Sequence, residues 1–194
     1  RRRARQCIFH EATVPACCRH PQAAGAGAIP TLDFQACIPE RAPLGCAVMS
    51  GAVDTKNPTA VAAEVQAAYL GMFPDGERTW VPRTFDWVVA CFIRGCADYQ
   101  AVDTRYHDLE HTLQGALCLA RLLRGRQRAG AAPVLTPHFF ELGLLAMLLH
   151  DTGYLKHRDD RAGTGAKYTV THVARSAQFA GRRLAEQGFS PADI

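Results

Sequence analysis

The sequence predicts an all-α fold, and three observations lead to this expectation. Apolar residues recur at three- and four-residue spacing over several long stretches, which is the pattern of helices with one buried face. Prolines stand directly after Asn57 and Thr136, and proline is favoured at the first position of a helix. No stretch shows the alternation of apolar and polar residues that marks a strand.

The first 56 residues of the 194-residue chain differ from the rest. They contain five prolines and an alanine- and glycine-rich stretch over 23–28, without a sustained period, so residues 1–56 are predicted to form an irregular N-terminal segment. Residues 57–194 are predicted to form a compact helical bundle. We expect this domain to be incomplete at its C-terminus, because Ser190, Pro191 and Asp193 have the pattern of another helix start.

Three helices are expected in the first half of this bundle. Asn57 and Pro58 open the first, which continues to Phe73. The second is predicted over residues 83–100, where apolar side chains form a core-facing stripe. The third is predicted to begin near Thr104 and to loosen at Gly125, and its first turns carry two histidines.

Two further helices follow. The fourth runs from Thr136 and Pro137 to Leu149 and is apolar nearly all round, which is typical of a central, buried helix. A polar, glycine-containing loop over 156–167 comes next and is interpreted as a rim or lid. The fifth helix is predicted over 171–187, and we expect its inner face to hold these residues: Val173, Ala177, Ala180 and Leu184.

Composition and charge exclude several classes of protein. The formal net charge is +4, and four arginines within the first five residues account for it, so no nucleic-acid surface is expected. The eight cysteines form no CxxC pair and are interpreted mostly as buried thiols of a cytoplasmic, reducing setting. No run approaches the roughly 20 apolar residues of a membrane span, so no membrane partner is expected. The oligomeric state is left open.

The strongest functional signal is a set of histidines and a carboxylate. His150 and Asp151 stand together at the end of the apolar fourth helix, and His107 and His111 are four residues apart, on one face of the predicted third helix. Imidazole nitrogens with a carboxylate oxygen suit Mn, Mg, Fe, Zn or Co. The sequence therefore predicts a site for one or two divalent metal ions.

These residues resemble the HD superfamily of metal-dependent phosphohydrolases, over roughly residues 85–194. The resemblance rests on His111, on the pair His150 and Asp151, and on the segment 171–176 that contains His172. Residues 106–111 (Tyr-His-Asp-Leu-Glu-His) are also similar to the Tyr-His-Asn-x-x-His motif of cyclic-nucleotide phosphodiesterases, with an aspartate in place of the asparagine.

The resemblance implies a role for each residue. His111, His150 and Asp151 would bind the metal, with Asp151 also acting in catalysis, and His107 would be the general acid. His172 resembles a histidine that two-metal members use for a second ion. A fourth ligand, an aspartate on a later helix, would lie beyond Ile194, and Asp193 is its only nominal candidate in the closing segment.

Neighbouring residues are expected to support this chemistry. Lys156, Arg158 and Lys167 on the polar loop are candidates to hold the anionic oxygens of a substrate. Tyr106 is expected to pack beside the site, and Asp108 to orient a ligand imidazole.

The function predicted from the sequence is the hydrolysis of a small-molecule phosphoester, namely a nucleotide or cyclic nucleotide, by metal-activated water. The branch that cuts cyclic dinucleotides is disfavoured, because Thr152, Gly153 and Tyr154 follow the His-Asp pair where that branch carries a lysine soon after it. The alternative is a non-catalytic HD-type module that binds a regulatory ligand or partner.

Overall fold

The computed structural model describes residues 52–96 and 98–194, and within these ranges the all-α prediction is confirmed. The described part holds two short 3-10 helices, η2 (Thr152–Tyr154) and η3 (Gly165–Tyr168), and no strand beyond one isolated bridge between Tyr99 and His157. The predicted irregular segment 1–56 lies almost wholly outside the described residues. The described α-helices are α1 (Pro58–Met72), α2 (Trp80–Arg94), α3 (Leu109–Arg128), α4 (Pro137–Leu149) and α5 (His172–Glu186).

Two helices begin where the sequence predicts, and their caps explain why. The side chain of Asn57 accepts hydrogen bonds from the backbone N–H groups of Thr59 and Ala60, and that of Thr136 accepts from Phe139. A proline follows each cap, at a position whose N–H would have no partner inside the helix. The predicted starts of α1 and α4 are therefore confirmed.

The prediction for α2 is wrong at both ends. The helix begins at Trp80 rather than Arg83, because Pro82 falls in the first turn, where a missing N–H costs no helical hydrogen bond. It stops at Arg94 because Gly95 takes a positive φ of 74°, which ends the helix and turns the chain back.

The start of α3 also differs from the prediction. Asp108 is the N-cap: its backbone is extended and its carboxylate accepts from the backbone N–H of His111, so the helix begins at Leu109 instead of near Thr104. His107 therefore precedes the helix, and the expectation that both histidines lie on one helical face is wrong for His107. The helix continues through Gly125, where loosening was predicted, to Arg128.

α5 lies within one residue of the predicted range at each end, but its inner face is different. Val173 is 70% exposed, and Ala177 is also exposed, so placing them inward was wrong. The buried residues are Ser176, Phe179 and Leu184. This face is selected because α5 packs mainly on η2, where the Ser176 hydroxyl accepts a hydrogen bond from the Gly153 N–H. The predicted further helix is only a turn within the described residues.

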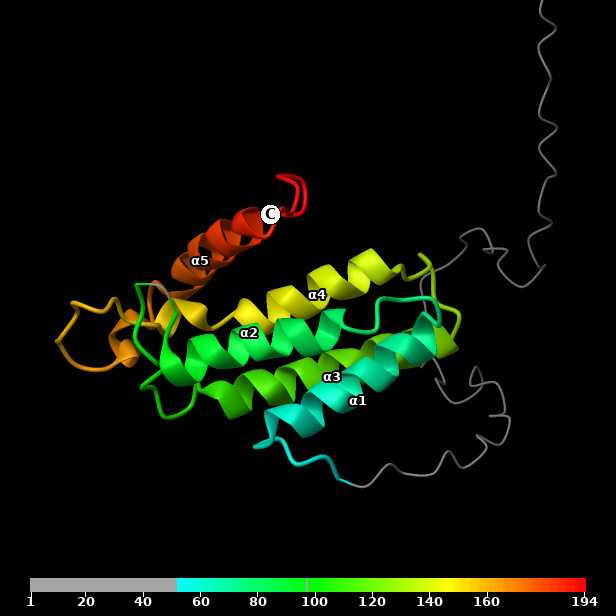
Figure 1. Ribbon diagram of the computed structural model, residues 1–194, viewed down its shortest axis with the longest axis horizontal. Helices are drawn as coiled ribbons and strands as arrows, with labels where there is room; N and C mark the ends of the chain where they lie inside the picture. Colours follow the sequence, from blue (N-terminus) through cyan, green and yellow to red (C-terminus); the bar gives the residue numbers. More distant parts are fainter. Residues whose placement is uncertain (1–51, 97) are drawn as a thin grey trace, which may run out of the picture. The chain divides into compact units, whose positions relative to one another are not determined.

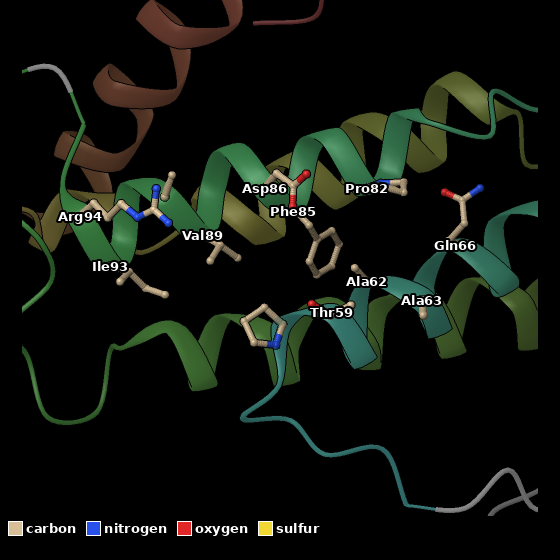
Figure 2. Close-up of a pocket in the computed structure, with 12 residues that line it drawn as sticks. Thr59, Ala62, Ala63, Gln66, Pro82, Phe85, Asp86, Val89, Ile93 and Arg94 are labelled. Atoms are coloured by element: carbon tan, nitrogen blue, oxygen red, sulfur yellow. The ribbon is translucent and has the colours of Figure 1, made fainter.

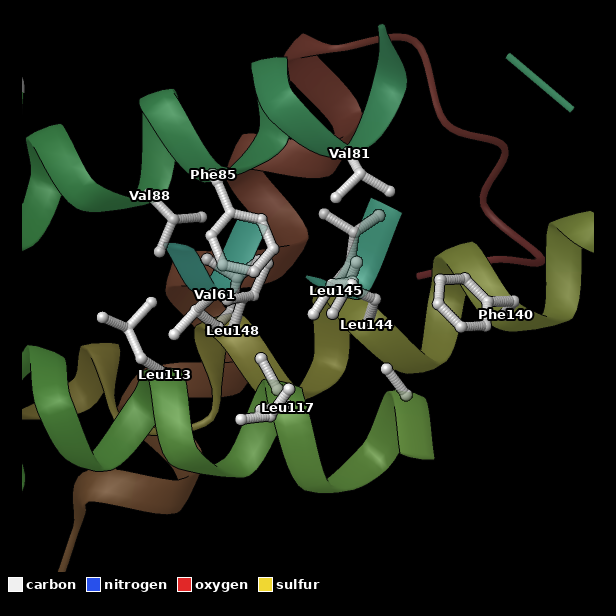
Figure 3. Packing of buried hydrophobic residues seen from close by; sticks show 14 of the residues in the cluster. Val61, Val81, Phe85, Val88, Leu113, Leu117, Phe140, Leu144, Leu145 and Leu148 are labelled. Carbon is white, nitrogen blue, oxygen red and sulfur yellow. The ribbon is translucent and has the colours of Figure 1, made fainter. Parts of the chain in front are cut away.

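Figure 1 shows α1, α2, α3 and α4 lying side by side, with α5 at an angle over α4. Their apolar faces meet in one core, to which α2 contributes Phe85 and Val88, and α4 contributes Leu144 and Leu148 (Figure 3). α3 and α4 run in opposite directions, so the start of α3 and the end of α4 meet at the same end of the bundle. This arrangement brings together the histidines that the sequence singles out.

No helix in the described ranges combines the length and the apolar character needed to cross a membrane.

Candidate metal centre

Three histidine rings converge on one oxygen of Asp151, whose side chain is only 2% exposed. The distances to Asp151 Oδ2 are 2.8 Å from His107 Nδ1, 3.1 Å from His150 Nε2 and 3.5 Å from His111 Nε2. The rings of His111 and His150 lie 5.5 Å apart between centroids and face this oxygen together. We call these four residues the histidine–aspartate cluster.

The cluster has the donor set and the spacing of a metal site. Potential ligand atoms of His107, His111 and Asp151 all lie within 4.8 Å of one another. Two atoms that each bond one ion at about 2.1 Å, at angles of about 90–110°, lie roughly 3.0–3.4 Å apart. The separations of 3.1 Å and 3.5 Å between Asp151 Oδ2 and the Nε2 atoms of His150 and His111 come close to this interval. These residues therefore fit a divalent cation.

Local structure fixes two of the rings. His150 ends α4, and its Nδ1 lies 2.7 Å from the carbonyl oxygen of Met147, one turn earlier. A carbonyl only accepts, so Nδ1 carries a proton, and Nε2 could bind a metal through its lone pair once its own proton is lost, as in metal-binding histidines. His111 is held in the first turn of α3 by the Asp108 cap. Asp108 thus contacts the backbone of His111 and not, as expected, an imidazole ring.

When no metal is bound, the electrostatics of the cluster favour a protonated His150 paired with an ionised Asp151. A hydrogen bond to Asp151 is the main cause that raises the pKa of His150 above its usual value. Burial alone would raise the pKa of Asp151, but hydrogen bonds from His150 and His107 outweigh it and lower the pKa. Asp151 therefore stays ionised near neutral pH, as a metal ligand must.

Tyr154 is a site residue that the sequence did not reveal. Its buried ring stacks on His107, with centroids 4.4 Å apart, and on His172, with centroids 4.7 Å apart. Only its position three residues after Asp151 connects it with the motif. Tyr106, as expected, packs beside the cluster: its ring centroid lies 5.1 Å from that of His107.

His172 lies next to the cluster but does not share its central oxygen. Its ring centroid is 6.0 Å from that of His107. His172 Nδ1 is bound to the carbonyl oxygen of Thr169 at 2.7 Å, which leaves Nε2 free to act as a base or ligand. Its role at a second ion stays a prediction.

The cationic residues of the loop are engaged elsewhere. Lys156 is buried and pairs with Asp103 at 3.0 Å, while Lys167 pairs with Asp160. Among the described residues, neither ammonium group forms a hydrogen bond or ion pair with the cluster. The two ion pairs stabilise the fold of the loop. The role of these lysines in binding substrate stays a prediction, as does that of the exposed Arg158.

Asp193, the nominal fourth ligand, is not in the cluster. Its carboxylate accepts a hydrogen bond from Ser190 and lies 2.8 Å from His138 Nε2, at the opposite end of α4 from His150.

A second concave feature is unrelated to the cluster. A groove of about 550 Å³ lies between α1 and α2, lined largely by apolar side chains such as Phe85, Val89 and Ile93 (Figure 2). No histidine lines it in the described part of the chain. Its volume is large, but its charged lining residues within the described ranges are a single carboxylate, Asp86, and Arg94, so it has no group of converging metal ligands.

Comparisons with protein-family models, with curated proteins and with solved structures find no match to this chain.

The raised pKa of His150 predicts the pH dependence of metal binding. The protonated imidazole has no lone pair for a metal, so each ion bound must displace one proton while the pH lies below this raised pKa. Affinity should rise about tenfold per pH unit there and level off above it. Calorimetric titrations with Zn²⁺ across this range would measure the slope. An unchanged slope in His150→Gln would assign the proton to another group.

Proposed function

We propose that this protein is a divalent-metal-dependent phosphohydrolase with an HD-type site, acting on a small phosphoester such as a nucleotide or cyclic nucleotide. The observation that carries the proposal is the convergence of three imidazoles on one buried carboxylate oxygen. A set of nitrogen and oxygen donors at the junction of two helix ends suits a cation that keeps open positions. The motifs that resemble the HD superfamily contribute these same residues.

The cluster divides into ligands and a proton donor. His111 and His150 would hold the ion through Nε2, and Asp151 through its carboxylate. When bound, the cation would lower the pKa of coordinated water toward about 7 and offset charge on a phosphoryl oxygen. That is the chemistry that phosphoester hydrolysis requires near neutral pH.

His107 is the proposed general acid. Asp151 binds its Nδ1 at 2.8 Å, and Tyr154 stacks on its ring, so the ring is fixed from two directions. The Asp151 carboxylate can only accept, and it does so at Nδ1, so Nε2 is the ring nitrogen left to hold the proton that is transferred. Nε2 would then deliver the proton to the leaving oxygen.

The change His107→Gln tests this division. We expect the metal content to be kept and the turnover of phosphoesters to fall at least about 100-fold, the usual contribution of a general acid. Phosphate release would be measured with a nucleotide, a cyclic nucleotide and a simple phosphomonoester, alongside metal analysis. The turnover of substrates whose leaving group needs no proton should fall less in this variant.

The matched control is His138→Gln. His138 lies twelve residues before His150, or about 18 Å along α4, and pairs with Asp193, so both metal content and turnover should stay unchanged. Loss of metal in His107→Gln would make His107 a ligand and contradict its role as the acid. The measurement discriminates between the two roles, because potential ligand atoms of His107, His111 and Asp151 lie within 4.8 Å of one another.

A non-catalytic HD-type module is the second candidate. One observation favours it: within the described residues, the group that could hold a metal contains a single carboxylate. Wild-type protein that binds metal at the cluster but hydrolyses none of the phosphoesters would support this candidate.

A further inference from the structure

A small polar cavity lies beside the segment that follows Asp151. It encloses about 120 Å³ between α5, residues 152–157 and Tyr99. Arg175, Arg182 and His157 line it, and no carboxylate does so among the described residues. None of the four residues of the histidine–aspartate cluster lines it either. The cavity is therefore a separate concentration of positive charge.

The periodicity of the α-helix places both arginines of α5 at this cavity. Arg175 and Arg182 are seven residues apart, which is two helical turns, so they share one face with Gln178 and the buried Phe179. That is the face with which α5 packs on η2.

Both guanidinium groups are held in place and still have donors to offer. Arg175 donates from Nε to the Gly153 carbonyl and from Nη2 to the Leu155 carbonyl, each at 2.7 Å, and it lies over the Tyr168 ring. Arg182 donates from Nη2 to the Tyr99 hydroxyl. A guanidinium has five N–H donors, so each retains several for a ligand.

The remaining wall is formed by packed side chains. The His157 ring packs on the Tyr99 ring with centroids 4.5 Å apart, and the backbones of these two residues form the isolated bridge. The Tyr99 ring in turn contacts Phe179 edge-on at 5.3 Å. The donors are thus ordered in advance, which lowers the entropic cost of binding an anion.

The size and chemistry of the cavity select the ligand. Its volume of about 120 Å³ corresponds to roughly four water molecules of the liquid, enough for a tetrahedral oxyanion. A nucleotide would need a pocket of about 300 Å³ or more. A planar guanidinium group can donate two parallel hydrogen bonds to the oxygens of a phosphate. A bound anion would also offset the repulsion between the two positive charges beside the cavity.

We propose that this cavity is a binding site for a phosphate-sized oxyanion, separate from the metal centre. The site does not depend on the proposed hydrolase activity.

The test uses inorganic phosphate and the full chain after treatment with EDTA. Phosphate is titrated at constant ionic strength while NMR follows the Nε–Hε signals of Arg175 and Arg182. Saturable shifts of both signals are expected. Absence of saturable binding to the wild-type protein would overturn the proposal, whatever the variants do.

Two variants locate the site. Arg182→Gln should weaken phosphate binding at least about tenfold, the value of one hydrogen bond to a charged group. Arg183→Gln removes the same charge from the next residue, which pairs with Glu186 and does not line the cavity, so it should leave binding unchanged. Equal losses in both variants would show general charge attraction and contradict the proposal.

A third variant separates this site from the metal centre. Phosphate binding should persist in Asp151→Asn, because Asp151 does not line the cavity. Binding that requires added metal, or that disappears in Asp151→Asn, would place the phosphate at the histidine–aspartate cluster and overturn the proposal.

Discussion

Replacing Asp151 with asparagine should remove metal binding almost completely. The carboxylate supplies the negative charge at the centre of the cluster, and a neutral asparagine amide cannot replace it. Loss of a partner that merely orients a ligand costs about 10–100-fold in metal affinity, so loss of a ligand should cost about 100-fold or more. Elemental analysis after dialysis and calorimetric titration with Mn²⁺ and Zn²⁺ would measure the change, and turnover should fall with it.

Asp159→Asn is the matched control for this substitution. Asp159 is an exposed residue of the polar loop, so the same chemical change there should leave metal affinity unaltered. If Asp151→Asn kept the wild-type affinity while remaining folded, the cluster would not be the metal site.

Replacing Gly153 with alanine should destabilise the protein by about 3 kcal/mol, at the upper end of the range for overpacking. A Cβ at this position would overlap the backbone carbonyl of His172, which a rotamer change cannot move away. The shift would also disturb the hydrogen bonds that join Gly153 to Ser176 and to Arg175. Urea unfolding of the two proteins would give the difference in the free energy of unfolding.

Gly125→Ala provides a control of opposite sign. Gly125 lies inside α3, and a Cβ there would meet no heavy atom within 4 Å. Alanine is favoured over glycine in a helix interior by about 0.5–1 kcal/mol, so this variant should be more stable than the wild type. If Gly153→Ala were also stabilising, the close packing of η2 on α5 would be contradicted.

The helices that could be predicted most accurately are those with local signals. At the starts of α1 and α4, the side chain of Asn57 or Thr136 accepts hydrogen bonds from backbone N–H groups. The proline that follows each of them lacks an N–H that would have no partner. Both effects depend only on neighbouring residues. The inner face of α5 could not be predicted in the same way, because Val173 is apolar but exposed. Contact with η2, a distant segment, decides that face.

The site shows the same division between local and distant causes. His111, His150 and Asp151 could be singled out from the sequence, because histidines and a carboxylate beside apolar helices stand out from their surroundings, and the structure brings them together. It misplaced His107, since the Asp108 cap starts α3 at Leu109, after His107, rather than near Thr104.

The partners of the loop cations were equally hidden from the sequence. Lys156 pairs with Asp103, 53 positions earlier, so the pairing depends on how the loop folds onto that segment. The cavity beside Arg175 and Arg182 likewise exists only once Tyr99 and the loop pack against α5.

The most direct test is a crystal structure of the metal-loaded protein, with anomalous diffraction recorded at the absorption edge of the bound metal. We expect an anomalous peak about 2.0–2.2 Å from the Asp151 carboxylate and from the Nε2 atoms of His111 and His150. A protein saturated with metal whose anomalous peaks lie only elsewhere, with these three side chains unbound, would contradict the account.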